Sequence, residues 1–379
     1  MTRAPARTAH VGTSDRHEFA FALARQHPMW ALTWLQPEES AQLAALLLHA
    51  DAFQAAASLL SGQDLPDTPD IQAMRSALAA GQGRYAESRE YAAQLLAGRR
   101  HALLQSTGPL RLQDLIPPET RHSMPTTGPL VSVVMPAYNA AQTIACSIRS
   151  VLRQRYQSIE LILVDDGSSD DTSEIARSEA GADTRLQVIR QSQRGAYGAR
   201  NAGIRAAHGQ YVTFLDADDV MLEDRIERQL DALQATSAAA AVSRLLRLDE
   251  CGRFMSPRVY PLIRHNVCSL FVRAAALATL GPFDEVQAGA DAEFENRINL
   301  CLGPGALHRQ RELQVVASWR AGSLTRAPGT GILDTQSRRS RIAYRESWMR
   351  LHAQGVLPGQ PVRTALTAAA DTRNARYHP

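Results

Sequence analysis

Between residues 131 and 215 the chain alternates short apolar runs with segments whose apolar residues recur every three or four positions. The short runs contain many β-branched residues and are predicted strands, and the periodic segments between them are predicted amphipathic helices. The strands are expected at residues 131–135, 159–164, 186–190 and 211–215. Strands that are apolar throughout and joined by helices predict a mainly parallel sheet covered on both faces.

The first hundred residues show helical spacing only, as in LAALLLHADAFQAAASLL and IQAMRSALAAGQGRYAESREYAAQLL. Residues 1–104 are therefore predicted to form a small helical domain. The second segment resembles a tetratricopeptide-type hairpin, although the three regular copies that a solenoid needs are not found. A packing or oligomerisation appendage is favoured over a peptide-binding role, so self-association or a protein partner is expected to act through these helices.

Changes in composition predict where the remaining segments begin and end. The stretch 105–128 is rich in proline and lacks periodicity, as expected of a linker. Residues 129–330 are predicted to form the α/β domain, and 331–379 a helical C-terminal extension and tail. The arginine-rich SRRSRIAYRESWMR in this extension is interpreted as a solvated helix face, with a phosphate-binding or anionic membrane surface as the alternative.

Composition limits the class of protein. The 379 residues are 45% hydrophobic, enough for a packed core, and all 41 basic residues are arginines in a chain of net charge +3. No basic tail indicates nucleic-acid binding. Four scattered cysteines argue against a zinc site or a disulfide framework. Because no apolar run could span a bilayer, the chain is expected in the cytoplasm, with a peripheral position at the inner membrane face as an alternative.

Polar residues follow three of the predicted strands. The first strand is followed by Pro136, Ala137, Tyr138 and Asn139, the second by Asp165 and Asp166, and the fourth by Asp216, Asp218 and Asp219. Ligands of parallel sheets bind beyond the carboxyl ends of the strands. The chain has neither a G-x-G-x-x-G after its first strand nor a P-loop lysine, so dinucleotide and Walker-type binding are not expected. Asp170 is interpreted as a cap of the helix near residue 171.

These motifs together resemble one known family. PLVSVVMPAYNAAQTIACSIRSVLRQRY, IELILVDDGSSDDT, RGAYGARNAGIRAAHGQYVTFLDADD, LGPFDE and GADAEFENRI occur in the order seen in family 2 glycosyltransferases. The resemblance covers about residues 131–302. It implies the GT-A fold, a Rossmann-like mixed α/β sheet, and transfer of a sugar from a nucleotide diphosphate to an acceptor hydroxyl.

The resemblance also implies how the nucleotide sugar is held, with UDP or dTDP favoured. Tyr138 would stack on the pyrimidine, and Asp166 would accept its ring N–H. Asp165 and the Pro136 backbone would lie alongside, with Ala137 and Asn139 in the same loop. Arg200 would orient the aspartates or contact the nucleotide, with a plain buried ion pair as the alternative. Arg194 and Gly195 are further candidates nearby.

Three carboxylates next to a diphosphate call for a divalent cation. By resemblance, Asp218 of the D-x-D motif is the direct ligand of Mg2+ or Mn2+, and Asp216 holds the ribose or a metal-bound water. Asp219 is expected to be structural, or to cap a helix near residue 222. Arg320 stands where many relatives carry a histidine, which leaves a third metal ligand open and makes a direct phosphate contact the alternative.

The general base of inverting relatives comes from a Glu-Asp pair, and GADAEF is the matching segment. Asp291 takes the Asp position, while Ala290 replaces the usual Glu. Asp291 is therefore favoured as the base, with Glu293 as the alternative and a helix N-cap as a structural role. Residues 265–273 are interpreted as a strand on the acceptor side, where His265 or Asn266 could contact a sugar.

The sequence thus predicts an inverting, metal-dependent glycosyltransferase that acts on a carbohydrate, lipid-linked or protein acceptor. One alternative is a sugar-1-phosphate nucleotidyltransferase, although PAYNAAQT is not its glycine-rich loop. The other is a GT-A scaffold without catalytic activity that works through its N-terminal helices.

Overall fold

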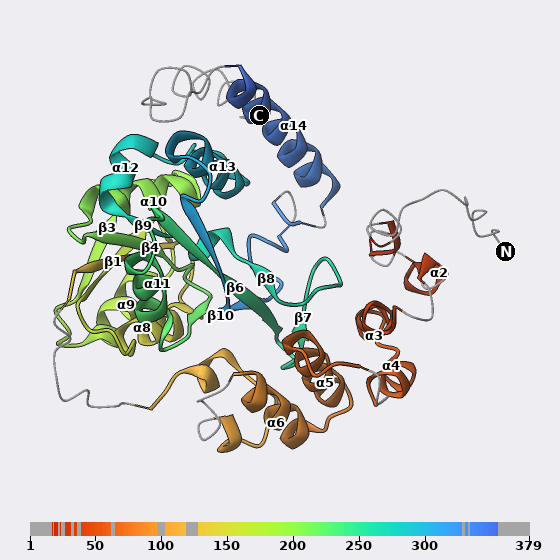
Figure 1. Cartoon of the computed structure of the whole chain (residues 1–379). Helices are drawn as coiled ribbons and strands as arrows, with labels where there is room; N and C mark the ends of the chain where they lie inside the picture. Colours follow the sequence, from red (N-terminus) through yellow and green to blue (C-terminus); the bar gives the residue numbers. More distant parts are fainter. Residues whose placement is uncertain are drawn as a thin grey trace. The chain divides into compact units, whose positions relative to one another are not determined.

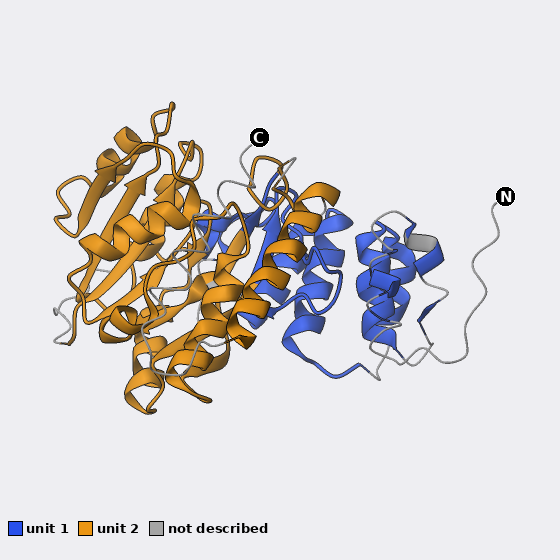
Figure 2. Ribbon diagram, turned by 90° about the horizontal axis from the view of Figure 1, so that it is seen from above, with its two compact units in different colours: residues 1–115, 246–264, 318–320 blue, residues 116–245, 265–317, 321–379 orange. Residues whose placement is uncertain are grey.

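The computed structural model describes most of residues 17–354. The positions within this range that it does not describe are 18, 22, 24–26, 32–33, 36–38, 62–64, 97–102, 119–127, 328–329 and 333. The predicted linker therefore lies partly, and the tail after Gln354 wholly, outside the described residues. The chain divides into two compact units (Figure 2). Unit 1 comprises residues 1–115, 246–264 and 318–320, and unit 2 comprises 116–245, 265–317 and 321–379.

Unit 1 is mainly helical. Its helices are α2 (Pro28–Ala31), α3 (Ser40–His49), α4 (Phe53–Leu60), α5 (Pro69–Gly81), α6 (Tyr85–Leu95) and the 3-10 helix η2 (Leu112–Leu115). Helix α5 begins with proline in its first turn after Thr68, whose hydroxyl accepts a hydrogen bond from the backbone of Ile71 (3.4 Å). On α6 the buried Arg89 guanidinium donates to the carbonyl oxygens of Leu103 (2.9 Å) and Gly108 (2.8 Å). This arginine ties the helices to the chain that follows them.

Unit 1 also contains residues 246–264, which the sequence analysis assigned to the α/β domain. This segment includes the end of β6 (Ala240–Asp249) and all of β7 (Phe254–Met255). One oxygen of Asp70 accepts hydrogen bonds from the backbone N–H groups of Leu262 (2.6 Å) and Ile263 (3.0 Å). Residues 246–264 are thus hydrogen-bonded to the start of α5.

Unit 2 is built on a mixed sheet. In chain order its further strands are β1 (Val131–Ala137), β2 (Ile159–Asp165), β3 (Leu186–Arg190), β4 (Tyr211–Phe214), β5 (Val220–Met221), β8 (Arg264–His265), β9 (Phe271–Arg273) and β10 (Leu307–Trp319). The order across the sheet is β3-β2-β1-β4-β9-β6-β10-β5 (Figure 1). The pairs among the first four strands are parallel, whereas β9 runs antiparallel to β4 and β6.

Helices cover both faces of this sheet. They are α8 (Ile144–Leu152), α9 (Thr172–Ala180), α10 (Gly195–Ala206), α11 (Arg225–Gln234), α12 (Ala274–Leu280), α13 (Ala290–Leu302), α14 (Thr335–Ala353) and the 3-10 helix η3 (Val267–Ser269). Neighbouring residues of β1 face opposite sides: Val133 packs in the cluster with α8 and α11, and Val134 in the cluster with α13. This explains why the strand is apolar throughout, and it confirms the predicted Rossmann-like mixed α/β sheet.

The strand order reverses between β1 and β4. From β1 the chain moves outward through β2 to β3, and α10 then carries it back to β4 on the other side of β1. A reversal of this kind opens the carboxyl ends of the two central strands to a ligand. The loops after β1 and β4 are therefore where the fold places a binding site.

Two local predictions were wrong. Residues 265–273 do not form one strand, because the 3-10 helix η3 separates β8 from β9. The helix expected near residue 222 begins at Arg225, with Asp224 at its N-cap position, so Asp219 does not cap it.

Candidate active site

The loops after β1 and β2 are fastened to each other by Asn139. Its side-chain oxygen accepts from the backbone of Ser169 (2.9 Å), and its own backbone N–H donates to the Ser168 hydroxyl (3.0 Å). Asn139 has a positive φ of 48°, which asparagine tolerates better than most residues. The neighbouring Tyr138 follows Pro136 and Ala137, the last two residues of β1, and is 49% exposed. The loop that carries the exposed Tyr138 ring is therefore held in place by the hydrogen bonds of Asn139 to the loop after β2.

Asp165 ends β2 and is buried. It accepts hydrogen bonds from the Ser168 backbone (2.8 Å) and the Ser173 hydroxyl (2.5 Å), and Arg190 lies 3.8 Å away. Burial alone would raise the pKa of Asp165, but these serines and Arg190 outweigh it and hold the pKa below its usual value. Asp165 is an ionised carboxylate that shapes the loop after β2. The neighbouring Asp170 does not cap α9 as an N-cap residue; it accepts from Thr172 and Ala141.

Asp166 binds the start of α10. Its oxygens accept from the backbone N–H groups of Arg194 (2.9 Å) and Gly195 (2.7 Å) and from the Gln191 side chain (2.6 Å). A carboxylate offers about four acceptor positions, so roughly one remains for a ligand. Arg194 also forms a bidentate ion pair with Glu285 (2.7 and 2.9 Å).

The D-x-D segment follows β4 and meets Arg200. Arg200 is buried on α10 and donates to the Asp216 carboxylate (2.5 Å). Burial alone would lower the pKa of Arg200, but Asp216 and its other neighbours raise it above its ordinary value, so the side chain stays charged. Asp218 is partly exposed and Asp219 buried. Arg200 thus forms an ion pair with Asp216, which is the alternative role that the sequence analysis gave this arginine.

Asp291 is held by hydrogen bonds to Tyr197. The Tyr197 hydroxyl donates to Asp291 Oδ1 (3.0 Å) and accepts from the backbone N–H groups of Gly289 (3.2 Å) and Asp291 (3.4 Å). This uses the one donor and both acceptor positions of a phenol. The Tyr197 ring lies under the guanidinium of Arg200, 5.1 Å from its centroid. A continuous series of contacts thus joins Asp216 to Asp291.

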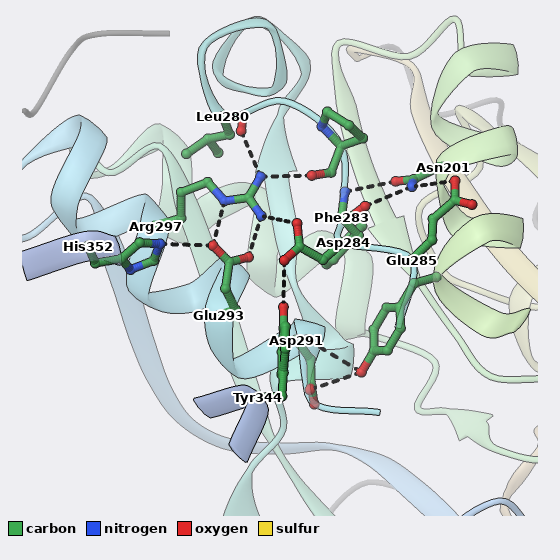
Figure 3. Close-up of polar contacts among 12 residues, drawn as sticks. Asn201, Leu280, Phe283, Asp284, Glu285, Asp291, Glu293, Arg297, Tyr344 and His352 are labelled. Atoms are coloured by element: carbon green, nitrogen blue, oxygen red, sulfur yellow. Dashed lines mark hydrogen bonds and ion pairs between the residues drawn. The ribbon is translucent and has the colours of Figure 1, made fainter. Parts of the chain in front are cut away.

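Glu293, the alternative base, is fully buried. It pairs with Arg297 and lies 3.1 Å from His352 Nε2, as Figure 3 shows. Burial alone would raise the pKa of Glu293, but His352 and Arg297 outweigh it and keep the pKa below its usual value. Its geometry is that of a structural ion pair. Asp291 is the partly exposed carboxylate, and Gly289 takes the N-cap position of α13.

Replacing Glu293 by Gln is expected to lower the free energy of unfolding by about 3 kcal/mol, because it removes the nearer of the two carboxylates that pair with buried Arg297 and leaves only Asp284, at 3.8 Å. A carboxylate with a lowered pKa contributes stability above its unfolded pKa and loses it as the pH falls through the folded pKa. The difference between wild type and Glu293→Gln should therefore shrink below about pH 4.5. Urea unfolding across pH measures it; a difference that is small at pH 7 contradicts the assignment.

Sequence reasoning missed Tyr197 and Asn201. The Asn201 amide donates to the carbonyl of Phe283 (2.9 Å) and accepts from its N–H (2.8 Å), which fixes the LGPFDE segment on α10. Tyr197 lies three positions before Arg200 and four before Asn201, a spacing that places all three close together on one helix. This helical spacing is the feature of the sequence that could have identified Tyr197 and Asn201 as neighbours of Arg200.

Two further candidates are Arg320 and His265. Arg320 belongs to unit 1, whereas the other site candidates belong to unit 2. His265 lies 3.1 Å from the Gln310 carbonyl, and burial lowers its pKa. Within the described ranges, no three His, Cys, Asp or Glu side chains are grouped so as to hold a metal ion by themselves.

A doubly covered mixed sheet with carboxylates at its reversal point defines an α/β protein whose ligand site is expected at that edge of the sheet. Residues 132–276 match the family Glycosyl transferase family 2. This stretch is a family 2 glycosyltransferase domain, which confirms the resemblance seen in the motifs.

Individual relatives each match about a third of the chain or less. Glycosyltransferase GlyG of Streptococcus pneumoniae serotype 4 is 38% identical over 122 residues, 32% of this chain and 40% of that protein. The Escherichia coli protein named UDP-Glc:alpha-D-GlcNAc-diphosphoundecaprenol beta-1,3-glucosyltransferase WfgD is 40% identical over 105 residues, 27% of this chain and 41% of that protein. The chain thus spans less than half the length of these two relatives.

Among solved structures, S. aureus TarS 1-349 in complex with UDP-GlcNAc has a TM-score of 0.43 and 21% identity, covering 51% of this chain and 59% of that chain.

Proposed function

We propose that this chain transfers a sugar from a UDP- or dTDP-sugar to an acceptor hydroxyl with inversion at the anomeric carbon. The observation that carries the proposal is the series Asp216, Arg200, Tyr197 and Asp291, which links the D-x-D segment to a partly exposed carboxylate within the family 2 domain. A carboxylate near the D-x-D segment suits a base that deprotonates the acceptor while the nucleoside diphosphate leaves.

The donor would be held at the carboxyl ends of β1, β2 and β4. The exposed Tyr138 ring can stack on a pyrimidine, and the remaining acceptor position of Asp166 can receive its ring N–H. Asp165 would act through the loop it shapes rather than through the nucleotide. Asp216 would face the ribose from its ion pair with Arg200.

A divalent cation, Mg2+ or Mn2+, fits the residues at the end of β4. Asp218 and Asp216 are hard oxygen donors, as both ions prefer, and a diphosphate would supply further oxygen ligands. Asp218 would hold the ion. Bound there, the ion supplies charge that stabilises the leaving diphosphate.

The acceptor is proposed to be a carbohydrate hydroxyl on a lipid-linked molecule, as in the printed name of WfgD, and the chain to act in glycoconjugate synthesis on the cytoplasmic side of a membrane. No helix among the described residues is long and apolar enough to cross a bilayer.

A panel of nucleotide sugars tested with and without Mn2+ for a rise in Tm, and for release of free nucleoside diphosphate, tests the proposal. UDP- or dTDP-sugars should raise Tm only with metal. Stabilisation by GDP-sugars alone would contradict the role of Asp166. Release of pyrophosphate from a sugar-1-phosphate and a nucleoside triphosphate would establish a nucleotidyltransferase instead.

Replacing Tyr197 by Phe is expected to lower kcat by about 10- to 100-fold, the effect of losing a hydrogen bond to a charged group. The ring keeps its packing against Phe283 and Arg200, so the KM for the donor should stay the same. Initial rates at varied donor concentration measure this split. A purely structural role would instead lower Tm and leave kcat of the folded fraction unchanged.

A further inference from the structure

The outward face of α14 combines two apolar side chains with arginines. Ile342 and Met349 are 52% and 48% exposed, and they lie two helical turns apart on the same side. They are two of the six large hydrophobic residues that are exposed in the described part of the chain. At 100° per residue, Arg338 and Arg345 border this stripe on one side, and the exposed pair Arg339 and Arg350 on the other.

The buried face of α14, whose centre lies about 110° around the helix from the stripe, is fixed to the α/β unit. Tyr344, Trp348 and His352 are buried, and the Tyr344 hydroxyl donates to Asp284 (2.8 Å; Figure 3). Gly289 has a φ of 98°, and a Cβ there would come within 3.4 Å of the Tyr344 ring. Because the inner face is held in this way, the stripe and its arginines point outward in a defined orientation.

Charge indicates what covers the outward face. Its four exposed arginines are opposed by one acid, Glu346, which lies 3.6 Å from Arg350. The sequence after Gln354 adds three arginines and one aspartate. Arginines on both sides of a narrow apolar stripe suit a planar surface of anionic headgroups, because their stems lie along the apolar layer while their guanidinium groups reach the phosphates.

We propose that the outward face of α14, defined by Arg338, Arg339, Ile342, Arg345, Met349 and Arg350, docks on a bilayer surface that contains anionic phospholipids. Docking depends on the face alone. One consequence rests on the proposed function: the inner face of α14 contacts Asp284 and Glu293, which flank Asp291 in sequence. The bilayer would then lie roughly one helix diameter, about 10 Å, from the segment that carries the base.

Sedimentation of the full chain with lipid vesicles tests the proposal. At low salt the wild type should bind vesicles in which about a third of the phosphatidylcholine is replaced by phosphatidylglycerol, and not phosphatidylcholine alone. The double variant Arg338→Gln/Arg345→Gln should bind about 25-fold more weakly, at about fivefold per arginine. The matched control Arg177→Gln/Arg205→Gln changes the same charge at exposed positions of α9 and α10 and should bind like the wild type.

A second variant separates docking from simple charge attraction. Ile342→Ser/Met349→Ser keeps every charge and should still weaken binding to the anionic vesicles, with at most a small fall in Tm because both side chains are about half exposed. Equal losses in the α9/α10 control, or full binding by either α14 variant, overturn the proposal. Binding of polyglutamate without binding of anionic vesicles would assign the face to an acidic protein and overturn it as well. Donor hydrolysis by these variants reports separately on the proposed function.

Discussion

Replacing Asp291 by Asn should lower kcat for sugar transfer by about 10²- to 10⁴-fold, the range for loss of a general base. Asparagine keeps the size of the side chain and can still accept the Tyr197 hydrogen bond, so the loop before α13 should keep its conformation. Donor binding, measured as the metal-dependent rise in Tm, should be unchanged. The loss of activity would then come from the missing proton acceptor and not from weaker donor binding.

The matched control is Asp231→Asn, an exposed carboxylate on α11 that makes the same chemical change away from the site. It should transfer at the wild-type rate. Full turnover by Asp291→Asn would falsify the assignment of the base, and a large loss of donor binding would point to a role in holding the nucleotide sugar.

Replacing Asp218 by Asn should abolish the metal-dependent stabilisation by the donor and lower kcat/KM by about 10³-fold or more. A divalent ion on the diphosphate contributes several kcal/mol to the transition state, and each 1.36 kcal/mol is tenfold in rate. Asp218 is partly exposed, so the apo protein should keep its Tm. Titration of Mn2+ at a fixed concentration of the UDP-sugar donor, followed by Tm and by rate, measures both effects.

Asp171→Asn is the matched control, since Asp171 is an exposed carboxylate that precedes α9 and lies outside the D-x-D segment. If it loses metal dependence as Asp218→Asn does, the effect comes from overall charge and not from ligation. A wild-type chain that transfers sugar at full rate in excess chelator would exclude the metal altogether.

The central strands were predicted to within about two residues because each is apolar throughout and ends at turn-forming residues. Residues 265–273 were harder to interpret, since their apolar side chains suit a strand. Asn266 accepts a hydrogen bond from the backbone of Cys268, and the Ser269 hydroxyl donates to the Asn266 carbonyl. These local bonds compete with the ladder of a strand and turn the chain into η3.

The position of the site follows from the strand ends, but its internal contacts do not. Nothing local links Tyr197 to Asp291, which lie 94 positions apart. The choice between Asp291 and Glu293 was more accessible: two residues apart on a helix, they differ by about 200° in direction, so one of them faces away from the core. The roles of Asp166 and Arg194 at the start of α10 depend on backbone geometry that the side-chain pattern does not encode.

The grouping of residues 246–264 with the N-terminal helices has a consequence for modularity. Deleting the chain up to the proline-rich stretch before β1 would leave the backbone N–H groups of Leu262 and Ile263 without the Asp70 carboxylate that accepts their hydrogen bonds. It would also part Arg253 from Asp51, with which it pairs at 2.6 Å. The N-terminal helices are therefore not an independent module that can be exchanged freely between relatives. A sequence that replaced these helices would also need matching changes in residues 246–264, well over a hundred positions further along the chain.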